Sequence, residues 1–293
     1  MSVLLRSFAK INWALEVGHR RADGYHEVRT VVQTIDLYDR LLLEEIDEEI
    51  EIICEDERVP CNQTNLAYKA AAALREATGI EKGVRIEIEK QIPVAAGLGG
   101  GSSNAAATLI GLQRLWNIGL PRQELFSIGE RLGSDVPFFF LGGTALATGR
   151  GERVYPLDDI TEPYILLVNP GIEVSTREAY AALRPMLTNQ NSPCIMPFAL
   201  FETEAIPVGP AQARNDLEKS VLPQYPVIAE IKQKLAEASA RSVLMSGSGA
   251  TVFAVFDSQS LLDRACEELR EESWLVIRTR TISRSDYHSS LIT

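Results

Sequence analysis

Hydrophobic and polar residues alternate over residues 8–17, which is the first clear pattern along the chain. A period of two residues is typical of a β-strand whose two faces meet different surroundings. Every second residue from 11 to 17 is apolar, so these side chains share one face of the strand. Lys10 and Asn12 fall between apolar positions and are therefore expected together on the opposite face.

The same periodicity, read together with turn residues, predicts the other elements of the chain. An Asp-Gly pair at 23–24 marks the turn after the first strand. Further strands are expected at residues 28–37, 41–46, 49–54, 84–89, 144–148, 164–168, 242–245, 251–256 and 274–279. Helices are expected at residues 65–78, with Asn62 or Thr64 as the N-cap, and at 103–116, 124–132, 176–183, 227–238 and 260–270. This mixture, with hairpin-like turns, indicates an α+β fold rather than a doubly wound sheet.

Length and charge narrow the class of protein. The chain has 293 residues, 45% of them hydrophobic, which favours two domains around a cleft. Prolines around residues 158–163 predict a boundary that divides the chain into residues 1–160 and 161–293. The net charge of −11 argues against a general binder of nucleic acid or anionic membranes. No apolar stretch reaches membrane-spanning length, and the N-terminus enters a strand pattern without a targeting region.

The cysteines indicate the compartment. Cys54, Cys61, Cys194 and Cys266 are scattered and show no metal-binding spacing. Free cysteines in a chain of this length suit a reducing environment, so we expect a cytoplasmic protein with ordinary thiols.

The segment 93–107, Pro-Val-Ala-Ala-Gly-Leu-Gly-Gly-Gly-Ser-Ser-Asn-Ala-Ala-Ala, carries the strongest chemical signal. Glycine lets the backbone approach a ligand closely. The helix predicted directly afterwards offers unpaired N–H groups and the positive end of its dipole. Together these features predict an anion site, for which a nucleotide phosphate is the expected ligand. A glycine-rich surface loop without a ligand is the alternative.

This loop differs from two common nucleotide-binding motifs. No Gly-Lys-Ser/Thr follows the glycines, so it is not a Walker A sequence. A dinucleotide-binding loop follows a strand that is buried on both faces, whereas residues 84–89 alternate between apolar and charged. The preceding strand therefore has one wet face and suits an antiparallel or mixed sheet.

Other candidate residues have ordinary alternatives. Lys10 alone is typical of a surface charge, and Asp135, before a proline in a turn, is typical of a turn former. A run of phenylalanines follows Asp135, however, and a carboxylate near apolar surface with a cation partner suits catalysis. The turns at 23–26 (Asp-Gly-Tyr-His) and 246–250 (Ser-Gly-Ser-Gly-Ala) are weak signals when each is taken alone.

Taken in order, these segments resemble the GHMP kinases, the superfamily of galactokinase, homoserine kinase and mevalonate kinase. Residues 9–12 (Ala-Lys-Ile-Asn), 93–107 and 246–250 match its three motifs. Within the superfamily the chain is most similar to the branch that phosphorylates a cytidine-diphosphate methylerythritol in the non-mevalonate isoprenoid pathway. The marks of that branch are the residues at 9–12, 18–26, 96–106, 134–139 and 215–218. Trp13 stands where the branch more often has leucine, and residues 188–212 match nothing in the pattern.

The resemblance implies a two-domain GHMP kinase fold whose active-site cleft lies between the domains. Residues 1–160 would form the ATP-binding domain and residues 161–293 an α+β domain. ATP and Mg²⁺ are the implied cofactors, and Ser103 or a neighbour is the expected ligand of Mg²⁺. The residues implied to hold ATP are Pro93, Val94, Ala95, Ala96, Gly97, Leu98, Gly99, Gly100, Gly101, Ser102 and Ser103.

The resemblance also implies a catalytic pair. Asp135 would take or orient the proton of the substrate hydroxyl, and Lys10 would stabilise both the oxygen and the carboxylate. Phosphoryl transfer needs mainly alignment and charge stabilisation, which a lysine, a metal ion and backbone amides supply.

Four residues are the implied contacts of the substrate: Asn12, Tyr25, His26 and Tyr180. His26 would hydrogen-bond the cytosine base, and Tyr180 is a candidate to stack on it. A small-molecule substrate is thus the expected partner, with no nucleic acid, no membrane, and a monomer or weak dimer as the assembly.

Two other functions remain open at this point. A GHMP kinase acting on homoserine, mevalonate or a sugar is one, and the tyrosine and histidine at 23–26 favour a base-bearing substrate over it. A non-catalytic sensor of nucleotides or metabolites is the other. Such a sensor could dispense with Lys10 and Asp135, and both are present.

Overall fold

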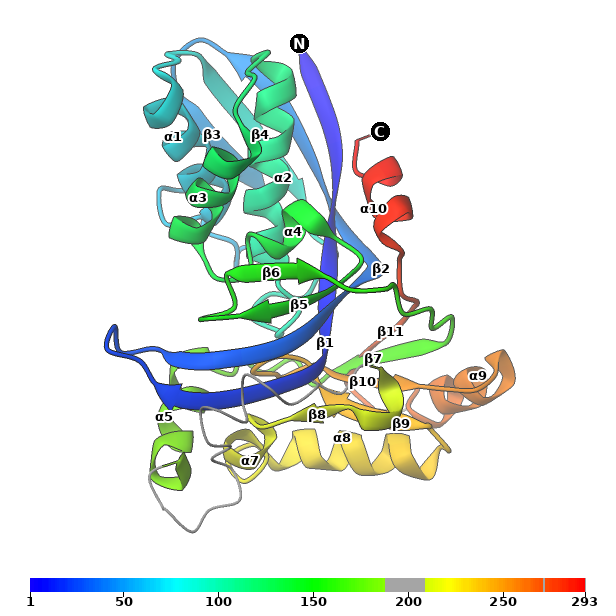
Figure 1. Cartoon of the computed structure of the whole chain (residues 1–293). Coiled ribbons are helices and arrows are strands. Elements are labelled where there is room, and N and C mark those ends of the chain that lie inside the picture. Colours follow the sequence, from blue (N-terminus) through cyan, green and yellow to red (C-terminus); the bar gives the residue numbers. More distant parts are fainter. Residues whose placement is uncertain (188–208, 271, 293) are drawn as a thin grey trace.

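Figure 1 shows the computed structural model of the chain, which describes residues 1–187, 209–270 and 272–292. The larger sheet contains β1 (Ser2–Arg20), β2 (His26–Ile46), β3 (Ile50–Cys54), β4 (Gly83–Glu89), β5 (Thr144–Thr148), β6 (Arg153–Pro156) and β8 (Arg214–Asn215). The smaller sheet contains β7 (Ile165–Asn169), β9 (Ser242–Met245), β10 (Val252–Val255) and β11 (Leu275–Thr279). The described helices are α1 (Leu66–Thr78), α2 (Gly100–Leu115), α3 (Arg122–Leu132), α4 (Phe138–Leu141), α5 (Thr176–Leu187), η1 (Pro210–Gln212), α7 (Glu218–Val221), α8 (Pro226–Glu237), α9 (Gln259–Glu268) and α10 (Arg284–Ser290).

The sheets confirm the α+β class. The larger sheet runs in the order β3-β4-β2-β1-β8, with β5 joined to β2 and β6, and the smaller in the order β11-β7-β10-β9. β4 pairs antiparallel with β2 and parallel with β3, so the strand before the glycine loop lies in a mixed sheet, as its alternation predicts. Apolar residues of α1, α2 and α3 pack with the apolar face of this sheet in one buried cluster. None of the described helices is long and apolar enough to cross a membrane.

β1 and β2 form a long antiparallel hairpin that curves from the first half of the molecule into the second (Figure 1). The sequence pattern predicts two strands in place of β2, with a break after residue 37, and this is wrong. Asp39 interrupts the apolar pattern, but its buried carboxylate accepts hydrogen bonds from the backbone N–H groups of Gln91 and Ile92. Its other oxygen lies 2.6 Å from Lys90 Nζ. The strand continues because a distant segment satisfies its polar residue.

The two halves share this hairpin. The boundary expected near residue 160 falls between β6 and β7, yet β8 of the second half pairs in parallel with β1. Trp13 of β1 is fully buried and meets the Phe253 ring of β10 edge-on, with centroids 5.3 Å apart. Helix α10 returns to the first half, where the Tyr287 hydroxyl donates to the Phe139 carbonyl.

Helix α1 has a different N-cap from either residue that the sequence suggests. Asn65 is the cap, since its side-chain oxygen accepts from the Ala67 N–H at 2.8 Å. Asn62 instead accepts from the N–H and hydroxyl of Thr64, which closes a turn before the helix. The prediction that Asn62 or Thr64 caps this helix is therefore wrong, because the polar groups of these two residues hydrogen-bond each other in the turn before the helix.

The packing of α2 on the hairpin yields a stability prediction. A Cβ on Gly111 would lie 2.4 Å from Leu43 Cδ1 and 2.7 Å from Leu5 Cδ1, and both leucines are fully buried. Overpacking costs about 1–3 kcal/mol, which exceeds the roughly 1 kcal/mol by which alanine favours a helix over glycine. Gly111→Ala should therefore lower the free energy of unfolding, measured in urea, by up to about 2 kcal/mol.

Gly101→Ala in the same helix is the matched control, because its added Cβ makes only an ordinary contact, 3.6 Å from Leu66 Cδ1. Its free energy of unfolding should stay within about 0.5 kcal/mol of the parent or rise. Equal losses in the two variants would contradict the packing argument.

Candidate active site

A cleft of about 1090 Å³ is lined by residues of both halves of the molecule. Its walls come from β1, from the glycine loop before α2, from the turn at 134–135, from the start of α5 and from the turn at 247–248. The segments that resemble the three GHMP motifs, which are far apart in the sequence, therefore meet in one cavity.

A buried lysine lies at the centre of this cleft. Lys10 is 4% exposed, and its Nζ donates to Asn12 Oδ1 at 2.8 Å. The same Nζ is 3.6 Å from Asp135 Oδ2, while 45% of the Asp135 side chain stays exposed. Asn12 Nδ2 donates to the Thr30 hydroxyl at 2.8 Å, which fixes the orientation of the amide. A buried ammonium requires such partners, and the exposed carboxylate can still meet a ligand.

The glycine loop needs its glycines for conformation and for space. Gly97 and Gly99 have φ angles of +76° and +72°, in the left-handed region. A Cβ on Gly97 would lie 2.1 Å from the Ser246 carbonyl oxygen, and one on Gly99 would lie 3.0 Å from Lys10 Cγ. Gly99 is also the N-cap of α2 and offers no side chain to its first N–H groups. These N–H groups remain available to an anion at the edge of the cleft.

The third motif braces this loop from the other half. The Ser246 hydroxyl donates to the Gly97 carbonyl at 3.0 Å. Asn215 Nδ2 donates to the carbonyls of Met245 and Gly247 at 2.8 and 2.7 Å. Asn215, the first residue of the Asn-Asp-Leu-Glu segment, therefore fixes the turn that contains Ser246. That turn fixes the glycine loop through the bond from Ser246 to Gly97.

The two serines at the start of α2 have different surroundings. Ser103, the expected metal ligand, is 1% exposed, and its hydroxyl accepts from Ser7 Oγ at 2.8 Å. Ser102 lines the cleft, and its hydroxyl lies 3.8 Å from where a Cβ on Gly133 would be, beside the turn that carries Asp135. In the described part of the chain, no group of three or more His, Cys, Asp or Glu residues is placed to hold a metal ion.

Elsewhere in the lining of the cleft, β2 and α5 bring two aromatic rings together. The His26 and Tyr180 rings stack with centroids 5.7 Å apart at 24°, and His26 is 6% exposed. Burial raises the pKa of the Tyr180 phenol, and the charge of Asp135 raises it further, so the phenol stays neutral. Tyr25 is exposed, and its ring lies under the Arg150 guanidinium at 5.2 Å.

Sequence reasoning missed several parts of the lining, and two of them carry arginines. Residues 58–60 and 64–66 line the cleft. Arg58 is fixed there by two hydrogen bonds to Asp56, which raise the pKa of its guanidinium. This stretch has no periodicity, and its polar residues suggested only a helix cap. Arg150 was the second omission, although an arginine between two glycines was a readable signal.

Comparison with known families and structures agrees with this geometry. The family model described as GHMP kinases N terminal domain matches residues 65–143, and that described as GHMP kinases C terminal matches residues 206–273. A solved structure titled 4-(cytidine 5'-diphospho)-2C-methyl-D-erythritol kinase has a TM-score of 0.77 at 35% identity and covers 96% of this chain and 100% of its own. A mevalonate kinase structure from L. major, with R-mevalonate bound, has a TM-score of 0.70 at 16% identity, covers 96% of each chain and thus shares the fold.

Two curated relatives match over nearly the whole chain. The 4-diphosphocytidyl-2-C-methyl-D-erythritol kinase of Alkaliphilus oremlandii (strain OhILAs) is 45% identical over 269 residues, 91% of this chain and 92% of that protein. The enzyme of the same name from Geobacter sulfurreducens (strain ATCC 51573 / DSM 12127 / PCA) is 44% identical over 279 residues, 95% of this chain and 98% of that protein. With its three motifs gathered in one cleft and this likeness along its length, the chain belongs to the GHMP kinases and, within them, to the 4-diphosphocytidyl-2-C-methyl-D-erythritol kinase family.

Proposed function

We propose that this protein transfers the terminal phosphoryl group of ATP to the 2-hydroxyl of 4-diphosphocytidyl-2-C-methyl-D-erythritol, a step of isoprenoid precursor synthesis. The observation that carries the chemistry is the Lys10–Asp135 pair, 3.6 Å apart, in the cleft that also contains the glycine loop. Relatives of that activity at 45% and 44% identity support the choice of substrate over other alcohols.

Each residue of the pair has one role in the transfer. Asp135 accepts or orients the proton of the attacking hydroxyl as the new oxygen–phosphorus bond forms and the bond to ADP breaks. Lys10 stabilises the negative charge on that oxygen, and Asn12 holds the ammonium in place through its bond of 2.8 Å. The N–H groups at the start of α2 bind the phosphates of ATP. The residues therefore align the reactants and balance charge, as phosphoryl transfer requires.

The residues around the loop fit a magnesium ion that is bound mainly by ATP. Mg²⁺ prefers oxygen ligands and in such sites takes one or two from the protein, with phosphates and water as the rest. Ser102 and Asp135 are cleft residues with suitable oxygens, and Ser103, the next residue of α2, is buried. The ion would supply positive charge to the transferring phosphoryl group.

The stacked rings of His26 and Tyr180 suit the cytidine end of the substrate. A buried imidazole can hydrogen-bond the edge of cytosine, and a tyrosine face or edge can pack on the ring. Tyr25 would cover the same base from the solvent side. The substrate thus extends from these rings to Lys10 and Asp135.

The free thiols and the cleft bear on the compartment and the assembly of the enzyme. Cys54, Cys61 and Cys266 are free, as suits a reducing cytoplasm. A monomer or weak dimer is the assembly that we propose, since the described chain forms both walls of the cleft by itself.

Turnover of the cytidylyl substrate with ATP, compared with mevalonate and homoserine, tests the activity. In the presence of ATP, we expect ADP release with the cytidylyl substrate and none with mevalonate or homoserine. Asp135→Asn should lower kcat by about 10²-fold or more, because the variant loses a general base, and should leave ATP affinity nearly unchanged. Near-normal turnover by Asp135→Asn would remove this carboxylate from the mechanism. Turnover of mevalonate or homoserine in place of the cytidylyl substrate would reject the function.

A pair of glycine variants tests the phosphate loop. Gly97→Ala places a Cβ against the Ser246 carbonyl, so the loop must shift. A shift of about 1 Å costs roughly 10²-fold in rate, which we expect in kcat/KM for ATP. Gly171→Ala is the matched control, since Gly171 has the same φ of +76° with nothing within 4 Å of its added Cβ. Equal losses would show that backbone strain, and not the position of the loop, is responsible.

The nucleoside end is tested by truncating its rings. His26→Ala and Tyr180→Ala should each raise KM for the cytidylyl substrate roughly tenfold, the effect of losing about 1–3 kcal/mol of base contact. KM for ATP should stay nearly constant in both. Tyr155→Ala is the control, because Tyr155 is exposed on β6 outside the cleft lining. A rise in KM for ATP, in place of a rise in KM for the cytidylyl substrate, would show that these rings contact ATP and would contradict the prediction.

A further inference from the structure

The turn between β5 and β6 touches both ends of the proposed substrate site. Arg150 in this turn lines the cleft, and its guanidinium carbon is 5.2 Å from the centre of the Tyr25 ring. Next to it, a Cβ on Gly151 would lie 3.6 Å from Ser134 Cβ. Arg150 is therefore placed between the hairpin tip that carries Tyr25 and His26 and the turn that carries Asp135.

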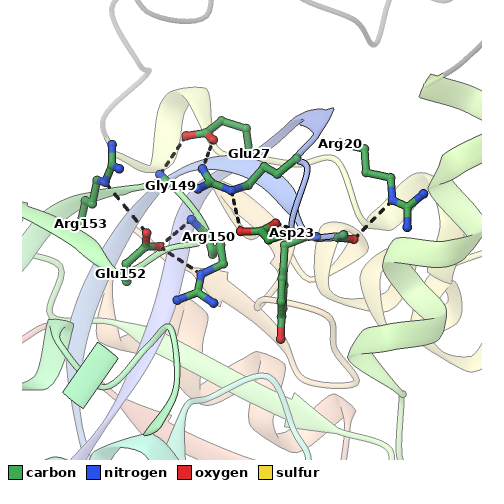
Figure 2. Close-up of polar contacts among 10 residues, drawn as sticks. Arg20, Asp23, Glu27, Gly149, Arg150, Glu152 and Arg153 are labelled. Atoms are coloured by element: carbon green, nitrogen blue, oxygen red, sulfur yellow. Dashed lines mark hydrogen bonds and ion pairs between the residues drawn. The ribbon is translucent and has the colours of Figure 1, made fainter. Parts of the chain in front are cut away.

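The carboxylates of Glu27 and Glu152 hold the backbone of this turn, and Figure 2 shows their contacts. Glu27 Oε1 accepts from the Gly149 N–H at 3.1 Å, and the Gly149 carbonyl accepts from the Val28 N–H at 2.7 Å. Glu152 Oε2 accepts from the Arg150 N–H at 2.6 Å. The first two bonds attach the turn to β2, next to His26, and the third holds the backbone of Arg150 within the turn.

The guanidinium of Arg150 keeps its donors available. Its nearest carboxylate oxygen is Glu152 Oε2, 3.9 Å from Nε, and 31% of the side chain is exposed. Among the residues that the structure describes, the guanidinium donates no hydrogen bond to a carboxylate. Arg58, elsewhere in the lining, contrasts with it, because both Arg58 Nε and Nη2 are bonded to Asp56. Arg177, the third arginine of the lining, is exposed on α5. Arg150 lies beside the Tyr25 ring with its planar fork free to bind another anion.

The substrate has such an anion at the corresponding place. Its cytosine and its reacting hydroxyl are joined by a diphosphate, which must cross from the His26 end to the Asp135 end. Asp23 and Asp135 both line the cleft, and each already has a cation partner, Arg21 and Lys10 respectively, so these cations are partly neutralised before the diphosphate arrives. A guanidinium fork matches phosphate oxygens in charge and geometry. We propose, on the basis of the function proposed above, that Arg150 binds the diphosphate of the substrate and sets its position between the two ends.

Kinetics of three variants test the proposal in the full-length enzyme. Arg150→Ala should raise KM for the cytidylyl substrate about tenfold or more, as expected for the loss of charge-assisted hydrogen bonds, with KM for ATP unchanged and a smaller change in kcat. Arg150→Lys should recover part of the loss, because it keeps the charge without the fork. Arg153→Ala is the matched control: Arg153 also pairs with Glu152, at 4.0 Å, but is mostly exposed and outside the cleft lining. An Arg150→Ala KM within twofold of the parent, or equal losses in Arg150→Ala and Arg153→Ala, would overturn the proposal.

Ligand binding separates this inference from the proposed activity. Calorimetry with cytidine diphosphate and with cytidine should show that the parent prefers the diphosphate. Arg150→Ala should abolish that preference and leave cytidine affinity intact, whereas His26→Ala should weaken both ligands. Loss of cytidine affinity in Arg150→Ala to the same extent as that of cytidine diphosphate would assign Arg150 to the base and overturn the proposal. Failure of the proposed function would appear differently, as absence of phosphoryl transfer by the parent enzyme.

Discussion

The buried ammonium group of Lys10 is the constraint on which the rest of the site depends. A charge that is removed from water must be matched by polar partners, and here they come from separate parts of the chain. Asn12 supplies an amide oxygen from the same strand, and Asp135 supplies a carboxylate from a distant turn. The backbone N–H of Lys10 donates to the Leu98 carbonyl at 3.0 Å, so the same residue also fixes the glycine loop. The contacts of Lys10 therefore determine together where its ammonium lies, how its charge is balanced and how the glycine loop is held.

Local pattern was sufficient wherever an element depends on its own residues. The strands at 144–148 and 242–245 have the bounds that the sequence predicts, and the helix after the glycine loop begins close to its expected start. The placement of Lys10 beside Asn12 also follows from a period of two residues. These features need no information from elsewhere in the chain, because the strand geometry alone determines which side chains share a face.

Sequence reasoning failed where a distant partner decides the outcome. β2 runs through Asp39 because Lys90 and two backbone amides satisfy that carboxylate, and no local pattern reveals them. The same holds for the cleft wall at residues 58–60 and 64–66, which an irregular segment builds. Arg150 is a mixed case: its place between two glycines is visible in the sequence, but its position beside the Tyr25 ring comes only from the fold. The roles of the recognised residues came from family resemblance, and their contacts came from the fold.

The shared hairpin has a consequence for how such enzymes can be rebuilt by recombination. Lys10, Asn12 and His26 all lie on β1 and β2, whose apolar face is buried against Phe253 of the other half. A chimera that joins the first half of one relative to the second half of another would exchange one side of this buried interface and the strand that pairs with β1. The hairpin and the two surfaces that it contacts therefore have to come from the same parent. Crossovers that leave these contacts unchanged are the ones expected to preserve a working cleft.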